Sequence, residues 1–106
     1  MTKEYEIGIN LIKTVRKELE ELTSVQDRLS ARRIVNSIIN PITASAYQIR
    51  VGDGPGKEEL LKVLLDIVRE MREISNLDNL KEKVKSLLEL VDSLEPATQE
   101  SQHGQS

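Results

Sequence analysis

Residues 28–57, RLSARRIVNSIINPITASAYQIRVGDGPGK, carry the signals that decide how this chain folds. Apolar residues recur there at three- and four-residue steps, the spacing of one helical face. Pro41 cannot donate a hydrogen bond to Ser37, and its ring clashes with the preceding turn, so we expect a break at Asn40–Pro41. Since Asn40 is a favourable N-cap and Pro41 a favoured first helical residue, a separate short helix is predicted over residues 41–51.

The residues before this stretch predict a helix over residues 2–22. Its apolar positions share one face, and Gly8 lies on that face, where a glycine indicates close approach of a neighbouring helix. Ser24 and Asp27 have the spacing of a capping box that starts the next helix.

The residues after it predict two more helices. Gly52 is expected to end the preceding helix in the left-handed conformation. Residues 57–74 then form the most apolar helix of the chain, and its wide apolar arc predicts contact with two or three other helices. A last helix follows a turn over residues 75–78 and is expected to end at Pro96.

This pattern predicts an all-α fold. Short connections make successive helices antiparallel, which indicates a small four-helix bundle whose second helix is broken at Asn40–Pro41, with five helical segments in total. We expect one domain over residues 1–95 and a disordered tail or linker over residues 96–106.

Composition excludes several functional classes. The chain has no Cys and a single His, His103, so disulfides, thiolate metal sites and His-based triads are excluded, and no cofactor is expected. No apolar run of about 18 residues is present, and the start MTKEYEIG lacks the order of a signal peptide, so we expect a cytoplasmic protein with no membrane partner. An aliphatic core with many Glu, Lys and Arg residues is typical of thermophile proteins.

Charge is segregated along the chain. Residues 28–52 contain four arginines and no acidic residue, a charge of +4, and the whole chain carries -3, so the remainder carries -7. At 100° per residue, the polar side chains of this stretch fall within one arc, with an arginine near each end and an aromatic ring within it. Such a face suits phosphates and a stacked base. The residues predicted to bind are Arg28, Arg32, Arg33, Asn36, Tyr47, Arg50 and Lys57. The alternative is that the arginines pair with carboxylates of neighbouring helices.

Three other motifs predict less. The loop over residues 52–56 resembles a phosphate cradle, but its glycine spacing and the Glu58 that follows Lys57 do not fit a P-loop. The simpler interpretation is that the loop leads into an ordinary capped helix. A less favoured interpretation is that the N–H groups at the start of that helix bind an anion. Residues 41–51 could serve as the recognition helix of a helix-turn-helix, although the turn at residues 40–41 is too short.

Carboxylate chemistry is the last alternative. Glu18 with Glu21, and Glu70 with Glu73, have the ExxE spacing of all-helical nucleotide pyrophosphatases, but no matching ExxD partner follows. We therefore do not expect an enzyme.

Two functions remain open. The first is a non-catalytic module that binds single-stranded DNA or another nucleic acid, or a nucleoside triphosphate, as an accessory domain of a replication or nucleic-acid-processing complex does. The second is a bundle for protein interaction or homo-oligomerisation, whose neutral-to-basic face meets an acidic partner.

Overall fold

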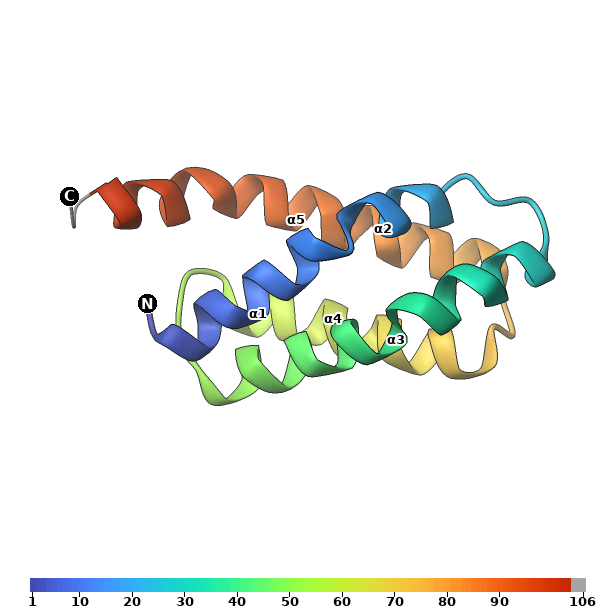
Figure 1. Ribbon diagram of the computed structural model, residues 1–106, viewed down its shortest axis with the longest axis horizontal. Helices are drawn as coiled ribbons and strands as arrows, with labels where there is room; N and C mark the ends of the chain where they lie inside the picture. Colours follow the sequence, from blue (N-terminus) through green and yellow to red (C-terminus); the bar gives the residue numbers. More distant parts are fainter. Residues whose placement is uncertain (104–106) are drawn as a thin grey trace.

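The computed structural model describes the backbone of residues 1–103 and the side chains of residues 1–94. Its helices are α1 (Lys3–Thr14), α2 (Arg16–Leu22), α3 (Arg28–Val51), α4 (Lys57–Glu73) and α5 (Leu77–His103), and no strand occurs within the described backbone. Figure 1 shows neighbouring arms running in opposite directions. The predicted all-α antiparallel bundle is confirmed, but its five helices are not the five predicted segments, because the first predicted helix is divided and the second is not.

The helices close into a ring of four arms. α3 packs against α1, α4 packs against α3, α5 packs against α4, and α2 returns to α5. α1 and α2 together form the first arm, which crosses the bundle diagonally from α3 toward α5 (Figure 1). Each arm therefore buries its apolar side against two neighbours.

The break in the first arm lies at Val15, where we expected a continuous helix. The backbone of Val15 has φ -107° and ψ 15°, between the two helices. Just before it, the Thr14 hydroxyl donates to the carbonyl oxygen of Asn10 at 2.8 Å, a side-chain bond that bends helices. Just after it, Arg16 reaches across to α5. The break lets one arm follow two differently directed neighbours.

α3 is continuous through Pro41, so the predicted break at Asn40–Pro41 is wrong. Val35, Ile38 and Ile42 stay on one buried face across the proline, because the 3.6-residue period is not interrupted there. Packing of both halves against the same neighbours outweighs the one backbone hydrogen bond that Pro41 cannot make. Ser37, whose carbonyl loses that bond, is exposed, which lets water take the place of the missing donor.

Two predicted caps also differ. Asp27 itself caps α3, since its carboxylate accepts from the backbone N–H of Ser30 at 2.8 Å, whereas the Ser24 hydroxyl donates to Glu21. Gly52 is extended at φ -92° rather than left-handed. It is nevertheless required there, because a Cβ would lie 2.6 Å from the backbone nitrogen of Tyr5.

Gly8 marks a close helix contact, as predicted. A Cβ at Gly8 would lie 2.6 Å from Cδ1 of Ile49 and 3.2 Å from the carbonyl oxygen of Ser45, both on α3. The bare glycine lets the Ser45 hydroxyl, which is fully buried, donate to the Gly8 carbonyl oxygen at 2.7 Å. This contact fixes how α1 lies on α3.

α4 supplies a large share of the core. Its inward side chains are almost completely buried: Leu60, Leu64, Ile67, Val68 and Met71. It packs mainly against two helices, α3 and α5. The wide apolar arc predicted two or three neighbours, so the smaller of these numbers is observed. The extra width of that arc is not covered: Leu61 is half-buried and Leu65 is 48% exposed.

α5 is helical to His103 and so passes Pro96, where we expected it to end. The side chains of residues 95–106 and the backbone of residues 104–106 lie outside the described residues. The division into residues 1–95 and 96–106 stays a prediction.

Candidate functional site

Two of the arginines predicted to bind a ligand, Arg28 and Arg32, donate hydrogen bonds to backbone carbonyls near the end of α4. Nη2 of Arg28 donates to the carbonyl oxygen of Ser75 at 2.9 Å, and Nη1 of Arg32 donates to the carbonyl oxygen of Met71 at 3.2 Å. The Met71 carbonyl belongs to the last turn of α4, whereas the Ser75 carbonyl lies in the turn that follows the C-cap Ile74, which is in the left-handed region at φ 50°. Arg32 satisfies carbonyls that the helix leaves free, and Arg28 holds the following turn, whose backbone conformation at Ile74 a β-branched residue rarely adopts.

Arg28 and Arg32 thus have partners within the protein, while their predicted role in binding a ligand stays a prediction. Arg32 places its positive charge at the negative end of the α4 dipole and caps that helix, whereas Arg28 holds the turn after it. The alternative expectation, pairing with carboxylates, is not what the structure shows for these two residues either. Their partners are backbone carbonyls, including that of Glu73, which Nη2 of Arg32 approaches at 3.5 Å.

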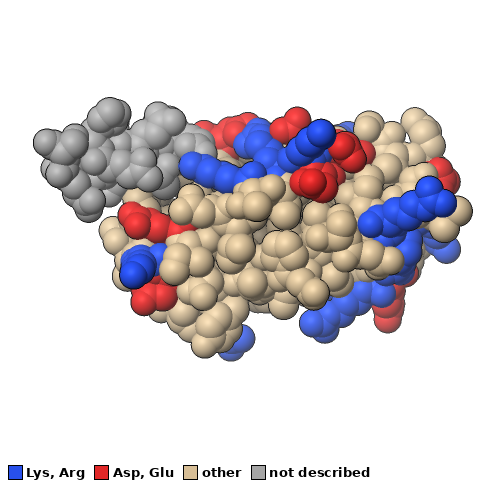
Figure 2. Space-filling model, in the orientation of Figure 1, with Lys and Arg blue, Asp and Glu red and all other residues tan. Residues whose placement is uncertain are grey.

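Four of the five remaining predicted residues, all but Lys57, lie on the outer side of α3. Figure 2 shows a broad uncharged area across the middle of one face of the molecule, with Lys and Arg gathered toward the end where α3 begins. Arg33, Asn36, Tyr47 and Arg50 are all exposed on α3. Tyr47 is 63% exposed, whereas Tyr5, the other tyrosine of the chain, is completely buried.

A depression lies between α3 and α4, which we call the α3–α4 pocket. It is lined by Thr43, Ala46, Tyr47, Arg50, Leu65, Val68 and Arg72, and its volume is about 180 Å³. The floor is apolar, formed where the arc of α4 is uncovered. An aromatic ring and two guanidinium groups stand around that floor, so the pocket offers one surface for a ring and two charges for an anion.

Two cationic side chains, Arg50 and Arg72, line the α3–α4 pocket. No carboxylate lines it. Neither Arg50 nor Arg72 makes a hydrogen bond or ion pair with any residue in the described part of the chain. Two guanidinium groups without an internal anion leave a local positive potential that is available to a ligand.

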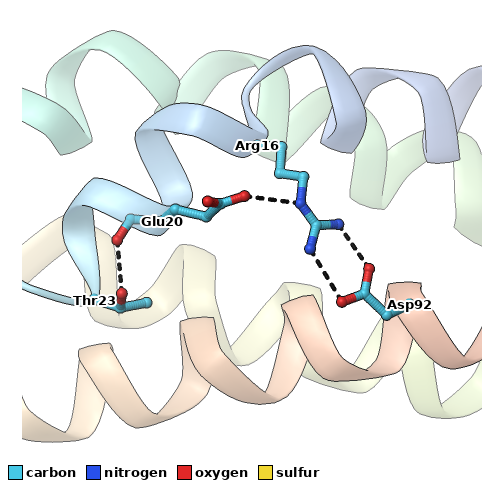
Figure 3. A network of polar contacts seen from close by, with 4 residues as sticks. All are labelled: Arg16, Glu20, Thr23 and Asp92. Atoms are coloured by element: carbon cyan, nitrogen blue, oxygen red, sulfur yellow. Dashed lines mark hydrogen bonds and ion pairs between the residues drawn. The ribbon is translucent and has the colours of Figure 1, made fainter.

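In contrast to Arg50 and Arg72, Arg16 is paired with carboxylates (Figure 3). Its Nη1 and Nη2 donate to the two carboxylate oxygens of Asp92 at 2.8 and 3.0 Å, and its Nε donates to Glu20 at 2.9 Å. The hydrogen bonds from Arg16 lower the pKa of the Asp92 carboxyl. Glu20 in turn accepts from the Thr23 hydroxyl through its carbonyl oxygen at 2.6 Å. This network fastens the broken first arm to α5.

Arg33 lies beyond the α3–α4 pocket, near the start of α3. It contributes to lowering the pKa of Asp27, although the hydrogen bonds from Ser30 are the main cause. Arg33 and Asn36 make no hydrogen bond or ion pair with the described residues. Both side chains are therefore available on the same helix as Tyr47 and Arg50, outside the pocket.

Lys57 and the glycine loop do not join this site. Lys57 begins α4 and does not line the α3–α4 pocket. The loop is packed on the start of α1: the Tyr5 hydroxyl donates to the carbonyl oxygen of Pro55, and the backbone N–H of Asp53 donates to the Thr2 hydroxyl at 2.8 Å. A Cβ at Gly54 would meet the Tyr5 ring at 2.6 Å. The loop glycines serve this internal contact.

The ExxE pairs form no metal cluster in the part of the chain with described side chains. One carboxylate of the second pair is engaged, since Oε1 of Glu70 accepts from the side-chain amide of Asn79 at 3.0 Å. Across the described residues, no helix combines the length and apolar character needed to span a membrane.

Comparison with known proteins adds no assignment. The chain matches no protein-family model, no curated protein and no solved structure.

Arg72 is the site residue that sequence reasoning missed. It alternates with Glu70 and Glu73 along α4, a mixture of signs typical of a solvated face. Its helical position is the available signal: it lies four residues after Val68, on the side of α4 that faces α3. Only the packing of α4 against α3 brings it to Tyr47.

Proposed function

We propose that the protein is a non-catalytic helical module that binds a nucleic acid or a nucleotide through the α3–α4 pocket. The single observation that carries the proposal is the grouping of an exposed ring, Tyr47, with two arginines that have no partner among the described residues, Arg50 and Arg72. A ring supports stacking of a base, and a guanidinium supports contact with a phosphate. No catalytic group is part of the proposal.

The first experiment measures binding of ATP and of fluorescently labelled single-stranded DNA at about 50 mM salt, a condition that favours electrostatic attraction. Arg50→Glu and Arg72→Glu should each abolish binding while the circular dichroism spectrum stays helical, because neither residue lies in the core. Tyr47→Ala should weaken ligands that carry a base by about 1–3 kcal/mol and leave inorganic phosphate unaffected.

Lys17→Glu is the matched control. Lys17 is exposed on α2, and its substitution makes the same change in total charge as Arg50→Glu. If Lys17→Glu weakens binding as much as Arg50→Glu, the attraction is nonspecific and the α3–α4 pocket is not the site. Absence of binding by either ligand class at this salt concentration contradicts the whole proposal.

A protein-interaction or self-association surface is the second candidate. Its support is the exposed apolar surface: Leu65 on α4 is 48% exposed, and Val51, on α3 with Tyr47 and Arg50, is 54% exposed. An acidic partner would match the arginines. This function predicts no binding of ATP or DNA, a concentration-dependent mass or capture of an acidic partner helix, and loss of that association in Leu65→Glu.

A further inference from the structure

We infer that the ligand is a single strand of nucleic acid lying along α3 from Arg33 to Arg50, and that a free nucleotide occupies only part of this path. The inference rests on the proposed function and specifies its ligand. It draws on the size of the α3–α4 pocket, on the hydrogen-bonding state of the α3 side chains and on the continuity of α3.

The α3–α4 pocket is too small to enclose a nucleotide. Its volume is about 180 Å³. Pockets that bury most of a small ligand measure about 300–1,000 Å³. A depression of this size holds one ring or one phosphate, so the rest of a larger ligand must lie on the neighbouring surface.

The outer side of α3 offers such a surface. At 100° per residue, Arg33, Asn36, Asn40 and Tyr47 fall along one exposed stripe. The two amides make no hydrogen bond with described residues, so their N–H groups are available to phosphate oxygens. No acidic residue occurs in α3, so nothing on this helix repels a polyanion.

The hydroxyl groups on this side are already committed as donors. The Ser37 hydroxyl donates to the carbonyl oxygen of Ile34, and the Thr43 hydroxyl donates to that of Ile39, each at 2.7 Å. The available donors are therefore Arg33 and the two amides on the stripe, together with Arg50 and Arg72 in the α3–α4 pocket beside Tyr47. These donors can contact successive phosphates of a strand, and the Tyr47 ring can stack on a base.

The continuity of α3 sets the length of the path. Arg33 and Arg50 are 17 residues apart on one helix, which at 1.5 Å per residue is about 25 Å. This distance corresponds to about seven nucleotides at the 3.4 Å spacing of a stacked strand, and to fewer if the strand is extended. A helix broken at Pro41 would have turned the two halves in different directions.

The exposed ring favours a single strand over a duplex. Tyr47 can stack only on a base whose face is free, and the faces of paired bases in a duplex are covered by their neighbours. A duplex could still be held by its phosphates, but Tyr47 would then contribute nothing to its affinity.

The test is a length series of oligothymidylates, with one, four, eight and twelve nucleotides, measured by fluorescence anisotropy. Affinity should rise by at least tenfold between four and eight nucleotides and change little from eight to twelve. Arg33→Gln should remove most of that gain for the eight-nucleotide strand and leave the four-nucleotide strand within about twofold, since a short strand occupies the end with two arginines.

Salt dependence gives a second readout. Three arginine contacts predict a slope of log affinity against log salt of about -2 for the eight-nucleotide strand, and Arg33→Gln should reduce its magnitude by about 0.7. Lys17→Gln is the matched control and should change neither the affinity nor the slope. A duplex of twelve base pairs should bind more weakly than the twelve-nucleotide strand and be insensitive to Tyr47→Ala.

The outcomes separate the two proposals. If the single nucleotide binds as tightly as the eight-nucleotide strand, or if Arg33→Gln has no effect on that strand, the strand path is wrong while the proposed function stands. If the duplex binds more tightly than the strand, the path is also wrong. If no member of the series binds, both proposals fail together.

Discussion

Arg32 on α3 holds the end of α4 through the carbonyl oxygen of Met71, at 3.2 Å from Nη1. Arg32, which the sequence predicted to contact a ligand, therefore stabilises the packing of α3 on α4. Arg50, on the same helix and in the same predicted arc, has no partner among the described residues. The two arginines should consequently separate stability from binding when they are substituted.

Arg32→Ala should lower the free energy of unfolding by about 1 kcal/mol, because the α4 carbonyls lose a charged donor and the helix end loses a compensating charge. Binding of single-stranded DNA by the folded protein should change by less than about twofold, well under 1.4 kcal/mol. Urea denaturation and fluorescence anisotropy measure the two quantities. Arg50→Ala is the matched variant, and it should show the opposite pattern. Loss of binding in Arg32→Ala at unchanged stability would contradict the capping role.

Pro41→Ala should stabilise the protein. The new N–H can donate to the Ser37 carbonyl oxygen and the ring clash is removed, so a gain of about 1–3 kcal/mol is expected from helix propensities. Asn40→Ala, next to it in an exposed helical position, should change the stability by no more than about 0.5 kcal/mol. Thermal and urea denaturation measure both. A loss of about 1 kcal/mol in Asn40→Ala would indicate an N-cap at Asn40 and hence a broken helix.

Gly8→Ala should destabilise the contact between α1 and α3. Its Cβ would lie 2.6 Å from Cδ1 of Ile49, a side chain with no exposed surface and little freedom to move. Overpacking of this kind costs about 1–3 kcal/mol, against a gain of about 1 kcal/mol in helix propensity. Asn10→Ala, exposed on the same helix, is the control and should be tolerated. In an Ile49→Ala background the cost of Gly8→Ala should shrink, so a double-mutant cycle that is strictly additive argues against the contact.

The pKa of Asp92 should depend on Arg16. Hydrogen bonds from Arg16 lower this pKa from its ordinary value of 3.8. A lowered pKa in the folded state means that the Arg16–Asp92 contribution to stability is present above pH 3.8 and is lost as the pH falls through the folded-state pKa. Carboxyl NMR titration of the native protein should give a value below 3.8, and Arg16→Gln should raise it. An unchanged Asp92 pKa in Arg16→Gln would show that the ion pair does not form in solution.

The spacing of apolar residues along the chain determines much of the fold. The recurrence of Ile, Leu and Val every three or four residues predicts the helices and their inward faces, because one turn of helix brings such residues together whatever lies beyond it. Gly8 on an apolar face predicts a close neighbour for the same reason, and Leu64, Ile67 and Met71 are fully buried on the face that their spacing defines. The absence of acidic residues from α3, and the ring of Tyr47 within it, are also properties of the chain itself.

The tertiary structure determined which residues that are far apart in the sequence come into contact. Pro41 stays inside a helix because both halves of α3 pack on the same neighbours, an energy that no local signal contains. Arg32 is committed and Arg50 is available because the end of α4 lies beside one and not the other, across 39 residues of chain in the case of Met71. Arg72 joins Tyr47 for the same reason. Helical periodicity specifies which side of a helix is buried, whereas the position of one helix along another depends on the packing of all four arms, and that position determines which charges remain for a ligand.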